Sequence, residues 1–277
     1  MTPSVPPSST LITIVTFVYF GALVLYWAGW IYASPRLAGA GRVAAVAGLL
    51  GNTASFFLRW VESYRMGAGH VPLSNLYESL VIFAIICVAT LVVIEVRYKL
   101  NYLGALVTPL AFFALAYAAL QSSEIRPLIP ALQSNWLHAH VFTAFLGYAA
   151  FAVALGLAVM YLLKKRSPDG SITSSLPEAG VLDQLMYQSV LLGFLFLTVG
   201  IITGAVWANS AWGRYWSWDP KETWSLITWF IYASLIHVRL VKGWAGTRTA
   251  VISIVGFAAV LFTWFGVNYL SGLHAYG

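Results

Sequence analysis

Residues 139–163 read AHVFTAFLGYAAFAVALGLAVMYLL, a continuous apolar run that contains no Asp, Glu, Lys or Arg. About 20 such residues in an α-helix are enough to cross the hydrocarbon core of a bilayer. The whole chain is 60% hydrophobic and only 9% charged, whereas an average soluble domain has about 25% charged residues. The sequence therefore predicts an integral membrane protein.

Further apolar stretches flank this run on both sides. The predicted spans lie near 11–33, 43–61, 76–96, 102–120, 139–163, 186–208, 224–241 and 249–270. The leader MTPSVPPSST lacks the basic residues of a secretory signal, so the first stretch is expected to be a permanent span. We therefore expect an all-α polytopic membrane protein in which residues 1–277 form a single domain, a bundle of about eight transmembrane helices.

The basic residues are unevenly divided between the loops on the two sides of this bundle. The larger set consists of Arg36, Arg42, Arg97, Lys99, Lys164, Lys165, Arg166, Arg239, Lys242 and Arg248. Because Lys and Arg mark the cytoplasmic side, or the stromal side in a plastid, both chain ends and residues 209–223 are expected on the outer face. The polar segment 164–185 is predicted to be a cytoplasmic linker between two halves of the bundle.

Composition also excludes several function classes. The formal net charge is +6, but no basic cluster indicates a nucleic-acid partner. The single cysteine, Cys87, excludes a disulfide framework, a cysteine-based zinc site and a C-x-x-C redox role within this chain. Any thiol redox chemistry must therefore come from other proteins.

Residues 207–229 read WANSAWGRYWSWDPKETWSLITW and hold six of the 12 Trp residues. A single indole is typical of the membrane interface, but six in one stretch would form a flat apolar surface suited to a large planar ligand. Arg214 and Lys221 could pair with carboxylates of such a ligand, although an outer-loop cation is more often simply solvated. The external part, 209–223, is therefore a candidate binding segment.

Two sequence patterns in these regions also have a local structural explanation. Asp219, with Pro220 and Glu222 after it, has the residues of an N-cap, a first helical position and a capping box. Asn75 and Glu78 show the same cap spacing at the start of another span. These patterns predict helix starts and do not exclude a binding role.

The chain has five histidines, His70, His138, His140, His237 and His274. His237 is expected in the inner leaflet, where a His marks a ligand or a proton path, or bonds a neighbouring helix. His138 and His140 point about 200° apart on a helix, so only one of them faces a shared pocket. Two external imidazoles on different helices could ligate a haem iron from both sides, or coincide by chance. No Ser or Cys nucleophile stands beside them, which disfavours a catalytic dyad.

Several motifs together resemble the CcsA (ResC) branch of the WWD-domain haem-handling family, in system II of cytochrome c biogenesis. They are GHVPLSNLYESL at 69–80, LQSNWLHAHVFTAFLGYAAF at 132–151, WGRYWSWDPKETW at 212–224, LIHVRL at 235–240 and SGLHAYG at 271–277. They occur in the order that the family has, and the resemblance covers about residues 50–277.

The resemblance implies roles for particular residues. His140 and His274 match the two external haem-iron ligands of the family, and His237 matches its intramembrane haem ligand. The tryptophan-rich segment matches the family's haem platform. The haem-binding residues expected there are Trp212, Arg214, Trp216, Trp218, Asp219 and Trp224. The bound group is expected to be haem b, and no acid or base side chain is singled out as catalytic.

The implied function is that of a haem lyase-type cytochrome c synthase subunit in a bacterial cytoplasmic or thylakoid membrane. It would carry haem to the outer face and present it to the C-x-x-C-H thiols of apocytochrome c, with thiol-reducing proteins acting indirectly. A CcsB (ResB) subunit, which supplies a further intramembrane His in fused forms of the family, is the expected partner. Two alternatives stay open: a haem exporter without synthase activity, and a haem-bearing electron-transfer subunit. A purely structural scaffold ranks last.

Overall fold

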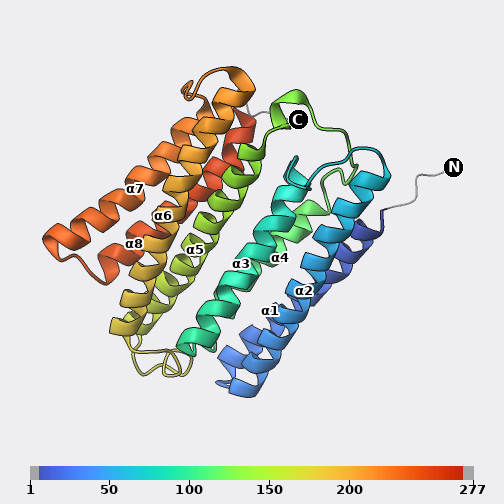
Figure 1. Cartoon of the computed structure of the whole chain (residues 1–277). Helices are drawn as coiled ribbons and strands as arrows, with labels where there is room; N and C mark the ends of the chain where they lie inside the picture. The colour runs from blue at the N-terminus through green and yellow to red at the C-terminus, as the bar shows by residue number, and fades with distance from the viewer. Residues whose placement is uncertain (1–5, 271–277) are drawn as a thin grey trace. The chain divides into compact units, whose positions relative to one another are not determined.

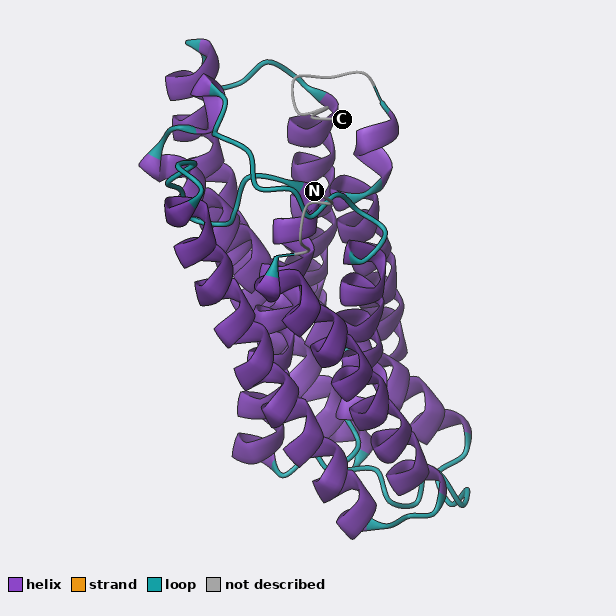
Figure 2. Cartoon of the chain, turned by 90° about the vertical axis from the view of Figure 1, so that its right-hand side faces the viewer, coloured by secondary structure: helices purple, strands orange, loops and turns teal. Residues whose placement is uncertain are grey.

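The computed structural model describes residues 6–270, and all regular structure in that range is helical (Figures 1 and 2). The α-helices are α1 (Pro7–Ile31), α2 (Pro35–Arg65), α3 (Leu76–Tyr98), α4 (Gly104–Ala118), α5 (Asn135–Arg166), α6 (Ala179–Trp212), α7 (Pro220–Lys242) and α8 (Thr247–Trp264). The 3₁₀ helices are η1 (Pro130–Leu132) and η2 (Gly266–Tyr269). The predicted all-α fold is confirmed.

Among the described residues, 7 helices are long and apolar enough to cross a membrane. The exception is α4, which has 15 residues and contains Pro109. At about 1.5 Å per residue it is too short to cross the roughly 30 Å of hydrocarbon by itself. The stretch predicted over 102–120 is therefore helical over a shorter range, because residues 99–103 form the turn that follows α3.

Several helices begin and end at residues whose chemistry explains the boundary. Ser34 and Asn75 accept backbone N–H bonds at the starts of α2 and α3, from Leu37 and Glu78. At the other end, Gly213 stops α6 in the left-handed conformation, with φ 72°. Only glycine adopts that conformation without steric cost, so it is the usual residue just after a helix.

The chain divides into two compact units at Ile129 and Pro130. In the first unit, α1 packs on α2 and α4, and α3 packs on α2 and α4 as well. In the second unit, α5 packs on α6 and α8, and α7 also packs on both of these helices. The linker predicted at 164–185 is shorter in the structure, covering 167–178, and it joins α5 to α6 inside the second unit. Its polar composition marks a connection between two helices, not the division between the units.

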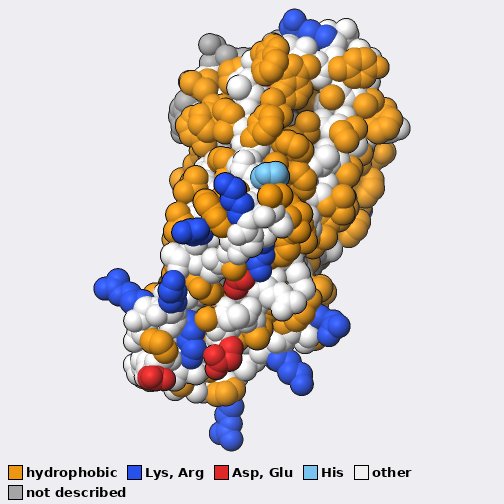
Figure 3. Space-filling model, turned by 90° about the vertical axis from the view of Figure 1, so that its left-hand side faces the viewer, with side chains coloured by type: hydrophobic (Ala, Val, Ile, Leu, Met, Phe, Trp, Pro, Cys, Tyr) orange, Lys and Arg blue, Asp and Glu red, His pale blue; other side chains and the backbone are white. Residues whose placement is uncertain are grey.

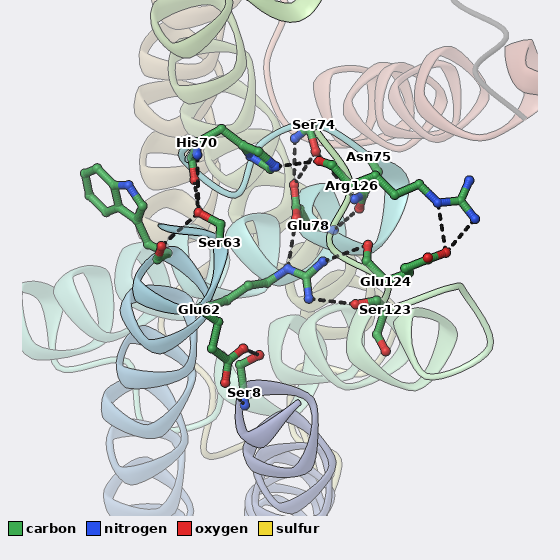
Figure 4. A network of polar contacts seen from close by, with 12 residues as sticks. Ser8, Glu62, Ser63, His70, Ser74, Asn75, Glu78, Ser123, Glu124 and Arg126 are labelled. Atoms are coloured by element: carbon green, nitrogen blue, oxygen red, sulfur yellow. Dashed lines mark hydrogen bonds and ion pairs between the residues drawn. The ribbon is translucent and has the colours of Figure 1, made fainter. Parts of the chain in front are cut away.

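A buried ion pair stabilises the first unit (Figure 4). Arg59 Nε donates to Glu78 Oε1 at 2.9 Å, and both side chains are almost fully buried. The guanidinium also donates to the carbonyl oxygens of Ser123 and Glu124, at 2.9 and 3.4 Å. Glu78 Oε2 in turn accepts from the backbone N–H and the hydroxyl of Ser74, both at 2.8 Å. The network therefore ties the loop after α4 to the adjoining ends of α2 and α3.

The motif at 69–80 is part of this network. The Asn75 cap is confirmed, but the Glu78 carboxylate turns to Ser74 and Arg59 instead of closing a capping box on Asn75. His70 is buried, and its Nε2 lies 2.9 Å from the carbonyl oxygen of Arg126 (Figure 4). In this structure, His70 and Glu78 hold loops together.

In the second unit, glycines let α5 and α6 approach closely. A Cβ added at Gly147 of α5 would lie 3.0 Å from the backbone nitrogen of Leu197. A Cβ added at Gly200 of α6 would lie 3.2 Å from the backbone nitrogen of Ala144. Small residues allow such contact between membrane helices, where dispersion between packed backbones replaces the hydrophobic effect. We call this contact the glycine seam, defined by Gly147, Gly200 and Gly204.

A second ion pair joins α6, α7 and α8 at the end of the unit farthest from residues 213–219, the tryptophan-rich turn between α6 and α7. Arg239 of α7 donates two hydrogen bonds to Asp183 of α6, at 3.0 and 2.7 Å. Asp183 Oδ1 also accepts from the Gly246 backbone N–H at 2.7 Å and from the Thr249 hydroxyl at 3.1 Å. One carboxylate therefore satisfies donors from the other two helices and from the turn that connects them.

Replacing Asp183 by Ala should destabilise the second unit, because it leaves the Arg239 guanidinium and the Gly246 N–H without this acceptor. Removing one member of a largely buried pair costs roughly 3 kcal/mol. Thermal unfolding in detergent should show a lower Tm for Asp183→Ala, whereas Asp169→Ala, at an exposed site in the loop 167–178, should match wild type. Equal midpoints for all three proteins would contradict this account.

Candidate functional site

The tryptophan-rich segment is a short turn between two helices of the second unit. It leaves α6 at Gly213, whose N–H donates to the Asn209 carbonyl oxygen at 2.9 Å, and it enters α7 at Pro220. The connection between these helices is therefore only residues 213–219. Such a short connection limits where its aromatic side chains lie.

The start of α7 is the capping box that the sequence predicts. Asp219 Oδ2 accepts from the Lys221 N–H at 3.0 Å, and Glu222 Oε2 accepts from the Asp219 N–H at 3.2 Å. Glu222 Oε2 also accepts from the backbone N–H and the hydroxyl of Ser217, at 2.7 and 3.2 Å. The same carboxylate that caps the helix therefore binds the turn on both sides of Trp218. We call this arrangement the Glu222 clasp.

Trp218 has a left-handed backbone, with φ 59°, although it is a large residue with a Cβ. That conformation is an outlier for a bulky side chain. It costs of the order of 1–3 kcal/mol and persists only where the surroundings impose it. The Glu222 clasp supplies this constraint, because its bonds to Ser217 and Asp219 fix the residues on either side. The result is an indole that is 69% exposed and stands edge-on to Trp216 at 5.7 Å between ring centroids.

The other predicted tryptophans have packing partners in the helices. Trp212 packs edge-on against Trp207, with ring centroids 5.0 Å apart. Trp224 lies 4.2 Å from the ring of Phe262 in α8. Arg214 is exposed in the turn. Trp216 and Trp218 are therefore the predicted indoles carried by the turn itself, whereas Trp212 and Trp224 lie at the two helix ends that support it.

His140 lies on the first part of α5, against the part of α6 that leads into this turn. Its Nδ1 is 2.8 Å from the carbonyl oxygen of Gly200, and its ring is nearly parallel to Trp207, at 16° and 5.8 Å between centroids. Trp207 is 3% exposed and donates from Nε1 to the Ala131 carbonyl oxygen at 2.9 Å. The fold therefore connects the predicted ligand His140 to the tryptophan-rich turn through Trp207 and Trp212.

The other predicted histidine ligands differ in what the structure describes. His274 lies outside the described residues, so its predicted role stays a prediction. His237 is exposed on α7, two residues before Arg239. Two helical steps turn a side chain by about 200°, so the pairing of Arg239 with Asp183 directs His237 to the opposite face of α7. His138 is half-buried on α5.

Hydrophobic side chains cover much of one face of the molecule, and Lys and Arg side chains gather at its lower end in Figure 3. An apolar band next to a charged end is typical of a protein embedded in a bilayer. The side of the membrane on which each end lies stays a prediction.

Sequence reasoning missed some residues that build the site. Gly200 and Gly204 carry no sequence signal of their own, because their importance depends on what α5 places opposite them. Trp207 belongs to the tryptophan-rich sequence, but its contact with His140 is visible only in the fold. Glu222 was recognised as a cap, whereas its bonds to Ser217 require the folded turn.

Comparison with known proteins places this chain in a family. The model of the cytochrome C assembly protein family matches residues 73–274. The chain is 39% identical to the cytochrome c biogenesis protein CcsA of Synechococcus sp. (strain CC9605), over 96% of this chain and 97% of that protein. It is 37% identical to CcsA of Guillardia theta, over 92% of each protein.

A solved structure shares the fold. The cytochrome c heme lyase CcmF superposes with a TM-score of 0.66 at 19% sequence identity, covering 96% of this chain. The chain spans 48% of that longer protein. With nearly the whole chain aligned to several of its members, this protein belongs to the CcsA family of cytochrome c biogenesis proteins.

Proposed function

We propose that this membrane protein presents haem at the outer face for attachment to apocytochrome c, as a subunit of a haem lyase-type synthase. Membership of the CcsA family gives it a role in cytochrome c biogenesis. The observation that carries the finer proposal is the chain of ring contacts from His140 through Trp207 to Trp212, the last residue of α6 before the tryptophan-rich turn. A ligand for iron and an exposed indole for a porphyrin ring, that of Trp218, then belong to one site.

In this proposal haem b is the substrate, and His140 is one axial ligand of its iron. His274 supplies the second ligand, as the motif GLHAYG predicts. The exposed indole of Trp218, supported by Trp216, lies against the porphyrin, and Arg214 pairs with a propionate. Two imidazole ligands occupy both axial positions of the iron and limit its reaction with oxygen.

The attachment chemistry needs positioning more than it needs an acid or a base. Each Cys S–H adds across one vinyl C=C of haem, so that sulfur bonds one carbon and the proton goes to the other. No electrons are exchanged, and nothing leaves. A site that holds the vinyl groups facing the two thiols makes the step effectively intramolecular. The C-x-x-C-H histidine then replaces one axial ligand and releases the product.

His237 fits a haem-loading role at the other end of α7. Its side chain is exposed, on the face of α7 opposite to the Asp183–Arg239 pair. We propose that a CcsB-type membrane subunit covers this exposed imidazole. The same subunit would supply the second ligand of the haem iron bound at His237. Haem then moves outward from His237 to His140.

His140→Ala should remove the outer haem site. Because the substitution removes an iron ligand, we expect the haem content of the detergent-purified chain, coexpressed with a CcsB-type subunit, to fall by roughly tenfold or more. The low-spin absorption bands should be lost as well. Cytochrome c maturation should fall in parallel. His138→Ala is the matched control, because it removes an imidazole two residues away on the same helix.

Unchanged haem spectra and unchanged cytochrome c maturation in His140→Ala would contradict the ligand assignment. The same preparations separate the alternatives. Haem that reaches the outer face without thioether formation, given reduced apocytochrome and the partner subunit, would favour an exporter. Turnover with quinol while haem stays bound would favour an electron-transfer subunit.

Glu222→Ala should loosen the turn that carries Trp218. The variant loses the acceptor for Ser217 and Asp219, so helix capping weakens by about 1 kcal/mol and the left-handed backbone of Trp218 loses its constraint. We expect several-fold weaker haem retention in a spectrophotometric titration.

Glu178→Ala is the control for this experiment, because Glu178 precedes α6 as its N-cap residue and makes no side-chain capping bond. It should bind haem as wild type does. Equal haem retention in Glu222→Ala and Glu178→Ala would show that the Glu222 clasp has no part in binding.

A further inference from the structure

We propose that Gly200 and Gly204 of α6 are positioning residues for His140: they hold its imidazole in one tautomer and one orientation, with Nε2 as the iron-binding nitrogen. The proposal rests on the proposed function of His140 as a haem ligand. The evidence is the contact that Gly200 and Gly204 of α6 make with the imidazole of His140 on α5.

The hydrogen bond to Gly200 decides where the proton lies. The distance from His140 Nδ1 to the Gly200 carbonyl oxygen is 2.8 Å, and a carbonyl oxygen only accepts. Nδ1 must therefore carry the hydrogen and act as the donor. In a neutral imidazole this assignment leaves the lone pair on Nε2, and a lone pair is what iron requires.

The missing side chain at position 204 decides where the ring lies. A Cβ added at Gly204 would come within 2.6 Å of His140 Nδ1 and 2.8 Å of Cε1. Contacts that short do not persist, so either the added methyl group or the ring must move. The ring cannot move away without losing its hydrogen bond to the Gly200 carbonyl oxygen. We therefore expect Gly204→Ala to displace the imidazole from the Gly200 carbonyl.

Trp207 limits the remaining freedom of the ring. Its indole is nearly parallel to the imidazole, and it is itself fixed by the bond from Nε1 to the Ala131 carbonyl oxygen. Gly200, Gly204 and Trp207 follow at spacings of four and three residues, so they lie on one face of α6. One face of α6 thus supplies the hydrogen-bond acceptor at Gly200, the space for the imidazole at Gly204 and the parallel indole of Trp207.

This arrangement has a chemical consequence for a bound iron. An imidazole whose Nδ1–H donates to a carbonyl oxygen is a more basic ligand through Nε2, and such outer contacts typically change metal affinity by about 10–100-fold. A more basic ligand stabilises the ferric state. Loss of the bond to Gly200 should therefore weaken haem binding and make the haem midpoint potential more positive.

The first test needs no haem. Histidine-selective ¹⁵N NMR of the haem-free full chain in detergent, with the His140 signals assigned from their absence in His140→Ala, distinguishes the two tautomers by the nitrogen shifts. We expect the Nδ1–H tautomer in the wild type. An Nε2–H tautomer at neutral pH would overturn the proposal, whatever the protein does with haem.

The second test compares Gly204→Ala with Gly180→Ala in the chain coexpressed with a CcsB-type subunit. Gly180 lies near the start of the same helix, and an added Cβ there meets nothing within 4 Å. We expect Gly204→Ala to bind haem at least about tenfold more weakly, with a more positive midpoint potential for the haem that remains. Gly180→Ala should match wild type.

Haem affinity and midpoint potential equal to wild type in Gly204→Ala would overturn the positioning role. Weaker haem binding with an unchanged midpoint potential would also overturn it, because looser packing of α5 on α6 lowers the affinity without changing the ligand. If His140→Ala binds haem as wild type does, the proposed function fails instead, and the NMR spectra still decide the tautomer.

Discussion

The close approach of α5 and α6 is the constraint on which the second unit depends. Gly147 and Gly200 bring the two backbones to distances at which a methyl group on either helix would meet main-chain atoms of the other. In a membrane, packing of this kind must replace the hydrophobic effect that holds soluble helices together. Because the contact is made by backbones, the rotation of α5 is fixed, and His140 is held against α6 near its tryptophan-rich end.

Helix capping and ligand presentation are done by the same atoms in the turn after α6. The Glu222 carboxylate accepts from the Asp219 N–H at the start of α7 and from the Ser217 N–H in the turn, and these bonds also hold Trp218 in a left-handed conformation. A cap is normally explained by helix stability alone. Here the stabilisation of the helix start offsets the conformational cost of an exposed indole.

Much of the fold could be predicted from the sequence because hydrocarbon imposes one rule, a long apolar stretch for each helix. The Asp219 and Asn75 caps are predictable for a similar reason, since capping depends on residues that are at most three positions apart. Other features depend on contacts between distant segments. The bonds from Arg59 to Ser123 and Glu124, and from His140 to Gly200, join residues about 60 positions apart, and no local pattern encodes them. The division at Ile129 was missed because polar composition marks loops rather than breaks in packing.

Arg59 recognises the loop after α4 through main-chain oxygens, not through side chains. Every residue type carries the same carbonyl group, so the path of this loop is specified while the identity of its side chains is left open. Point substitutions at Ser123 and Glu124 should therefore accumulate readily during evolution, whereas insertions or deletions that shift the carbonyls away from the guanidinium should be rare. The loop is constrained in length and permissive in sequence, the reverse of a segment that recognises a ligand by its side chains.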